Sequence, residues 1–149
     1  MTPQAELNGF IRKFLPATAK EGHAALRTLR KLMPGATQLV YDNYNFLVVG
    51  FGPSERASDA VMSLAFAPRW LALCFLQAGP KLPDPTKILR GSGGVVRNVR
   101  LMKAKDLDAP DVRALIKVAL SRARVPIPKG KGKLIIRSIS AKQRPRRPK

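Results

Sequence analysis

The chain has a single cysteine, Cys74, so it can form neither an internal disulfide nor a cysteine-rich metal site. Histidine is equally scarce, since His23 is the only one, and there are only nine acidic residues. No apolar run approaches the roughly 20 residues of a membrane-spanning helix, and no signal segment is visible. We therefore expect a soluble, cytoplasmic protein with no membrane contact, no bound metal and no cofactor.

Positive charge is the most unusual property of the composition. Lysine and arginine total 28, which gives a net charge of +19 and a pI near 11.3. Residues 129–149 hold nine of these basic residues and no acid, and the rest of the chain is also basic. Such a balance favours polyanionic partners, nucleic acid above all. The alternative is an organism whose proteins are generally basic.

Three stretches repeat their apolar residues at helical spacing. The first covers residues 4–15 and is predicted to end before Pro16. The second is predicted to begin at Thr18, whose side chain can form a capping box with Glu21, and to end at Pro34-Gly35. The third follows Asp108, which can cap it.

Short apolar runs between these helices predict strands at 39–41, 46–51 and 95–102. The stretch from Ala60 to Leu76 consists of two apolar arms joined at a proline turn, which predicts a hairpin at the centre of the fold. Both faces of its second arm are apolar, so we expect a strand that is covered on both sides or lies deep in the core. The predicted fold is α+β: an antiparallel sheet of about five strands, with two N-terminal helices and one C-terminal helix packed against it.

The basic C-terminal segment is predicted to lie outside the packed domain. We place the domain at residues 1–128 and a disordered basic tail at 129–149, because the tail has little apolar area to bury. Leu134–Ile136 is the exception and could pair with an edge strand. Without aromatic residues the tail can contact phosphates but not stack on bases. The predicted nucleic-acid-binding residues are Lys129, Lys131, Lys133, Arg137, Lys142, Arg144, Arg146, Arg147 and Lys149.

A ligand pocket is predicted from two further groups of residues. Tyr41, Asp42 and Tyr44 could line a small-molecule pocket at the end of the sheet. A glycine-rich loop could present backbone N–H groups to a phosphate, although a simple tight turn explains the same residues. This second group comprises Gly91, Ser92 and Gly93 of the loop with Arg97 and Arg100 beyond it.

The order and spacing of these signals resemble the YdhG-like family, also called domain of unknown function 1801, over residues 5–124. The matching residues are Tyr41-Asp42, the hairpin, Gly79, Leu82, Asp84, Pro85, Leu89, Gly91, Gly93, Arg97 and the helix from Asp111. The resemblance implies an α+β fold with helices laid against an antiparallel sheet. It also implies an iron-chaperone role, because some relatives are described as frataxin-like. Iron sites need convergent carboxylates and histidine, and this chain has no acidic helix face.

No arrangement of nucleophile, base and acid stands out in the sequence. His23 has no visible catalytic partner, and Cys74 lies among large apolar residues where a thiolate is unfavourable. We therefore expect a non-enzymatic YdhG-like domain that binds an acidic partner such as nucleic acid through its basic tail. The alternatives are a small-ligand or iron-carrier domain and an enzyme of unknown chemistry.

Overall fold

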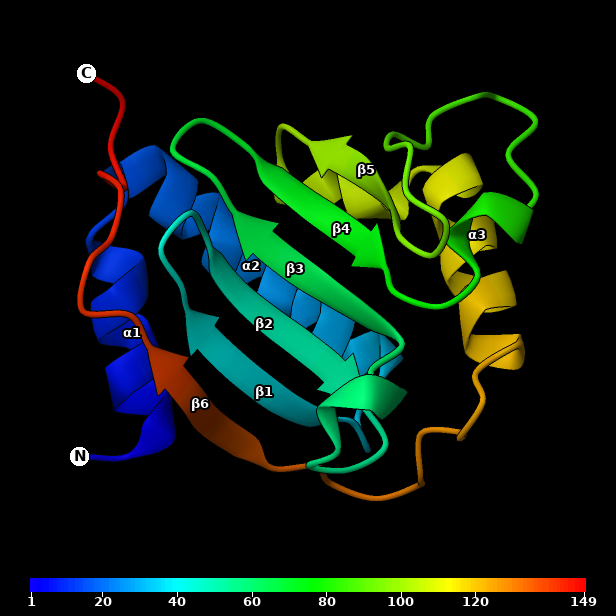
Figure 1. The fold of residues 1–149 in the computed structure, drawn as a ribbon, viewed down its shortest axis with the longest axis horizontal. Helices are drawn as coiled ribbons and strands as arrows, with labels where there is room; N and C mark the ends of the chain where they lie inside the picture. The colour runs from blue at the N-terminus through cyan, green and yellow to red at the C-terminus, as the bar shows by residue number, and fades with distance from the viewer.

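The computed structural model describes all 149 residues and contains three helices and one six-stranded sheet (Figure 1). The helices are α1 (Pro3–Arg12), α2 (Pro16–Leu32) and α3 (Pro110–Ser121). The strands are β1 (Thr37–Asp42), β2 (Leu47–Gly52), β3 (Met62–Phe66), β4 (Leu71–Phe75), β5 (Arg97–Leu101) and β6 (Leu134–Ile139). None of the helices combines the length and the apolar character that crossing a membrane requires.

The sheet has the strand order β5-β4-β3-β2-β1-β6. Neighbouring strands from β1 to β5 pair antiparallel, with short turns between β1 and β2 and between β3 and β4 and a long loop of residues 76–96 between β4 and β5, and only the β1–β6 pair is parallel. The predicted α+β class, with two N-terminal helices and one C-terminal helix, is confirmed. The sheet has one strand more than the five expected, because β6 adds to the free edge of β1.

All three helices lie on one side of the sheet, and its other face is bare (Figure 1). Side chains alternate along each strand, so Leu64 and Leu73 face the helices and are fully buried. Ala65 and Ala72, on the opposite face, are only partly buried. The hairpin is central as predicted, but the expectation of cover on both faces of its second arm is wrong. Its second apolar face is made of small residues, which bury little area and need no second layer.

The start of α2 differs from the sequence-based expectation. Pro16 is the first residue of α2, where its missing N–H costs nothing. Thr18 does not cap this helix; its hydroxyl donates to the carbonyl of Pro68 in the β3–β4 turn. Glu21 accepts a hydrogen bond from the backbone N–H of Ala104, at the start of a 3₁₀ segment (η3, Ala104–Asp108). Both side chains therefore attach α2 to the sheet layer instead of capping it.

The expectation of a disordered tail at 129–149 is wrong, and the pairing expected for Leu134–Ile136 is confirmed. β6 pairs with β1 from Gln38↔Leu134 to Asp42↔Ile139, with one shift in register between Val40 and Tyr41. Leu134 and Ile136 also pack against the hydrophobic core. β1 would otherwise expose an unpaired edge. The free energy gained by pairing with β1 and by burying apolar side chains therefore exceeds the conformational entropy lost when this segment becomes ordered, even though the residues on either side of it are charged.

Candidate nucleic-acid interface

The residues predicted to form one ligand pocket lie at two separate places in the sheet. Tyr41 and Asp42 belong to β1, and Tyr44 follows in the next turn, whereas Arg97 and Arg100 belong to β5. Three strands, β2 to β4, separate these groups. Residues 91–93 precede β5, and the guanidinium of Arg97 donates to the carbonyls of Gly93 and Val96. The guanidinium of Arg97 is therefore engaged by carbonyls of its own loop.

Asp42 anchors the C-terminal segment to the core. Its carboxylate is fully buried, and lies 2.9 Å from Nη2 of Arg146 and 3.1 Å from Nζ of Lys13. Arg146 is itself 5% exposed and also donates to the carbonyl of Asn43. Burial alone would raise the pKa of Asp42, but hydrogen bonds from Gln143, Arg146 and Lys13 outweigh it and hold the pKa below its ordinary value. Asp42 thus has a structural role.

Acid should weaken this anchor. Because the folded pKa of Asp42 lies below the ordinary value of 3.8, its ionised form stabilises the fold above that value. The contribution is lost as pH falls from 3.8 through the folded pKa. We expect urea denaturation of D42N to show a smaller acid-induced loss of unfolding free energy than the natural chain between about pH 4 and pH 2. An identical loss in both proteins would contradict the assignment.

Eight of the nine predicted tail cations are exposed, and Arg146 is the exception because it is buried against Asp42. The guanidinium of Arg137 donates to the carbonyl of Glu55, and that of Arg147 donates to the carbonyl of Lys13. Arg144 lies 5.6 Å from the centre of the Tyr44 ring. The tail therefore presents its charges from fixed positions on the folded surface.

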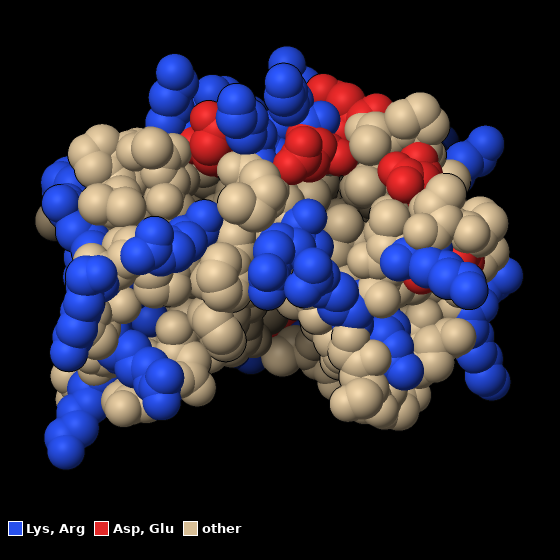
Figure 2. All heavy atoms as spheres, turned by 90° about the horizontal axis from the view of Figure 1, so that it is seen from above, with Lys and Arg blue, Asp and Glu red and all other residues tan.

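Aromatic side chains gather at one end of the bare sheet face. Tyr44 and Phe46, in the β1–β2 turn, are 48% and 44% exposed. Trp70 immediately precedes β4, and the guanidinium of Arg100 lies 4.1 Å above its ring. Figure 2 looks down on this end of the sheet and shows lysine and arginine side chains spread across it, with the surface hollowed at the lower edge. The molecule here combines exposed rings with positive charge.

A cavity of about 280 Å³ opens on the bare face beside these rings. We call it the slot. Strand register places its lining residues in three parallel rows, because positions opposite one another on neighbouring strands share a face. The rows are Phe46, Ala67 and Trp70; Val48, Ala65 and Ala72; and Ser63, Cys74 and Asn98.

Sequence reasoning missed this slot. Trp70 lies within the predicted hairpin and Phe46 at the start of a predicted strand, and neither is among the predicted site residues. The available signal was alanine at alternate positions: Ala65, Ala67 and Ala72 share one face of the hairpin. Small residues on one face of two neighbouring strands leave a hollow unless another layer fills it.

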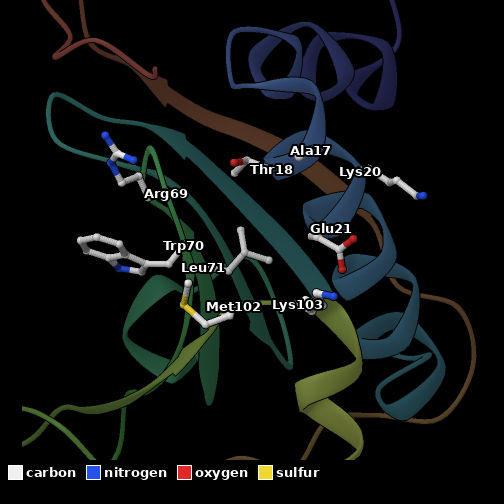
Figure 3. Close-up of a pocket in the computed structure, with 9 residues that line it drawn as sticks. All are labelled: Ala17, Thr18, Lys20, Glu21, Arg69, Trp70, Leu71, Met102 and Lys103. Atoms are coloured by element: carbon white, nitrogen blue, oxygen red, sulfur yellow. The ribbon is translucent and has the colours of Figure 1, made fainter. Parts of the chain in front are cut away.

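A second cavity, of about 320 Å³, lies between the first turn of α2 and the β3–β4 turn (Figure 3). Lys20, Glu21, Arg69 and Lys103 contribute charge to its wall. Figure 3 shows Lys20 and Arg69 extending away from each other, on opposite sides of the cavity. Glu21 is already engaged by the N–H of Ala104. Lys20 and Arg69 therefore do not converge on a common point, and the carboxylate of Glu21 opposes an anion, so this cavity is not a preorganised anion site.

The structure shows no cluster of metal-binding side chains, and its one thiol is not activated. No group of three or more histidine, cysteine, aspartate or glutamate side chains could hold a metal ion. Burial raises the pKa of the Cys74 thiol more than its hydrogen bond with Ser63 lowers it, so the thiol stays protonated. No family model, curated protein or solved structure matches the chain. Function is therefore inferred from the geometry and charge of the molecule itself.

Proposed function

We propose that this protein is a non-enzymatic, YdhG-like domain that binds nucleic acid through its basic surface. The observation that carries the proposal is the lack of carboxylate partners for its positive charge. Only four of the 28 lysine and arginine residues lie within 4.0 Å of a carboxylate. The remaining 24 have no carboxylate partner within the protein, so their positive charge is not neutralised internally.

The acidic residues support the same proposal, because most of them serve internal contacts. Asp42, Asp59 and Asp108 form ion pairs. Four others accept hydrogen bonds from backbone N–H groups, and these are Glu21, Asp84, Asp106 and Asp111. Seven of the nine acids thus make contacts within the fold, and because 28 basic residues face only nine acids, a phosphate backbone approaching the protein meets a net positive charge.

Binding of this kind positions phosphates and does not read sequence. The exposed lysines at 129, 131 and 133 donate to no side chain or backbone carbonyl within the protein, so they can each contact one phosphate. Lysine is a flexible point charge and imposes little geometry on its partner. We therefore expect affinity that depends on salt and on charge, with little dependence on base sequence.

A small-ligand carrier is the second candidate, and the slot is the observation that favours it. A mainly apolar cavity with a few polar groups at one end is the usual form of a small-molecule site. The slot lining contains no charged residue. An iron carrier would need a different set of ligands from the residues found there.

Salt dependence tests the proposed function. We expect the logarithm of the binding constant for a 12-nucleotide oligothymidylate to fall linearly with the logarithm of salt concentration, by about 0.7 per phosphate contact. The triple variant K129Q/K131Q/K133Q should make this slope shallower by about 2. Fluorescence anisotropy of a labelled oligonucleotide gives both slopes.

The matched control removes three exposed charges from the helix layer, as K20Q/R27Q/K31Q. These side chains are exposed on α2, on the far side of the sheet from its bare face. The control should keep the slope of the natural chain. Weak binding by all three proteins at about 0.15 M salt, with a flat slope, would reject the proposed function.

A further inference from the structure

We propose that the slot holds an unpaired nucleobase, so that the nucleic acid bound by this protein is single-stranded. The inference rests on the proposed function and names the class of nucleic acid and the site of base contact. Its basis is the geometry of the slot, the chemistry of its lining and the charge at its rim.

Two aromatic rings flank the mouth of the slot with an alanine between them. Leu47, Phe66 and Leu71 lie opposite one another on β2, β3 and β4. The next residues outward are Phe46, Ala67 and Trp70, and the N–H of Ala67 donates to the carbonyl of Trp70 at 2.9 Å. The backbones at Phe46 and Trp70 thus stand two strand spacings apart, at roughly 9.6 Å. A flat ring stacked between two others needs about 7–8 Å, two van der Waals contacts.

The floor and the far end of the slot suit a heterocycle. Ala65 and Ala72 form a flat apolar floor behind the mouth. Ser63 and Asn98 bring polar groups to the end furthest from the rings. The side-chain N–H of Asn98 donates to the carbonyl of Arg90, which leaves its amide oxygen as an acceptor. A base edge carries the donors that such an acceptor pairs with, and no charged group in the lining opposes a neutral ring.

The rim of the slot carries positive charge. A neutral heterocycle without a phosphate would not require this charge, whereas a nucleic acid would. Arg100 covers the Trp70 ring at 4.1 Å, and Arg144 lies 5.6 Å from the centre of the Tyr44 ring. Aromatic rings beside arginines are the elements with which proteins hold single strands, since bases stack while phosphates meet cations. Bases within a duplex are stacked on one another and cannot enter a slot one ring wide. The geometry therefore favours a single strand.

Intrinsic fluorescence reports on the slot directly, because Trp70 is the only tryptophan in the chain. We expect a 12-nucleotide oligothymidylate to quench this fluorescence, whereas an abasic oligomer of equal length and charge should not. Stacking one base contributes enough that F46A should weaken oligothymidylate binding between about 5-fold and about 150-fold. The same variant should leave binding of the abasic oligomer unchanged.

Two further variants separate stacking from folding. F46L keeps an apolar side chain at this exposed position but removes the ring, so it should lose affinity as F46A does. V95A truncates an apolar side chain that is 55% exposed and lies outside the slot, so it should bind as the natural chain does. Circular dichroism should show equal helix content in all three variants.

The outcomes distinguish this inference from the proposed function. If the abasic oligomer and oligothymidylate bind equally, without quenching, the slot assignment is wrong and phosphate binding stands. If neither oligomer binds at about 0.15 M salt, the proposed function fails as well. If free thymidine quenches Trp70 with the same affinity as the oligomer, phosphates contribute nothing and the slot belongs to a small ligand.

Discussion

Replacing Arg146 with alanine should lower the free energy of unfolding by about 3–5 kcal/mol, nearer the lower limit because Lys13 remains. The substitution leaves the buried carboxylate of Asp42 without its best partner. In the structure Nη2 of Arg146 lies 2.9 Å from that carboxylate, and both side chains are almost fully buried. Removing one partner of a buried ion pair leaves a buried charge without compensation, and this destabilises a protein far more than replacing the whole pair with apolar residues does. Urea denaturation at pH 7 measures the loss.

The matched control is R147A, one residue further along the chain. Arg147 is exposed and its guanidinium donates only to the carbonyl of Lys13, so its removal should cost less than about 1 kcal/mol. Equal losses in the two variants would show that Asp42 does not hold the C-terminal segment. Truncation at residue 128 removes both Arg146 and β6 and should destabilise the remaining domain. Charge substitutions therefore test nucleic-acid binding more cleanly than truncation does.

Phe66 and Gly22 should show strong coupling in a double-mutant cycle. Phe66 is fully buried and packs on Phe14, with ring centres 5.6 Å apart, so F66A should cost about 3–5 kcal/mol. A Cβ at Gly22 of α2 would lie 2.1 Å from Cε2 of Phe66. We expect G22A to cost about 1–3 kcal/mol through overpacking, although alanine favours a helix.

The double variant G22A/F66A should cost less than the two single losses together, by at least about 1 kcal/mol, because alanine at 66 makes room for the new methyl group. Additive losses would contradict the packing of α2 on β3. The control is G9A in α1, where a Cβ would meet nothing within 4 Å. It should raise the free energy of unfolding by about 0.5–1 kcal/mol through helix propensity alone.

Much of the fold could be predicted from hydrophobic periodicity. The central hairpin, the first two strands and the three helices follow patterns within single stretches of sequence, and the structure has them in place. Capping was less predictable. Thr18 and Glu21 have the spacing of a capping box, but each contacts a segment distant in the chain. Local patterns do not show when a tertiary partner competes for the same side chain.

The C-terminal segment could not be predicted from its composition, which is typical of disorder. Its order depends on two features outside the segment: the free edge of β1 and the buried carboxylate of Asp42. Arg146 and Asp42 are 104 residues apart, so no local pattern reveals their pairing. The slot was missed for a related reason. Whether alanines on one sheet face are covered or open depends on where the helices pack.

The most direct test of nucleic-acid binding at the bare sheet face is to locate the bound strand by photo-cross-linking. An oligonucleotide carrying a single 4-thiothymidine is bound to the full chain, irradiated and mapped by mass spectrometry of the proteolysed complex. We predict cross-links on peptides that contain Phe46 or Trp70. Cross-links confined to residues 129–149, or to the helix layer, would contradict a base in the slot. No cross-link at any position, under conditions where a known single-strand binder cross-links, would contradict nucleic-acid binding itself.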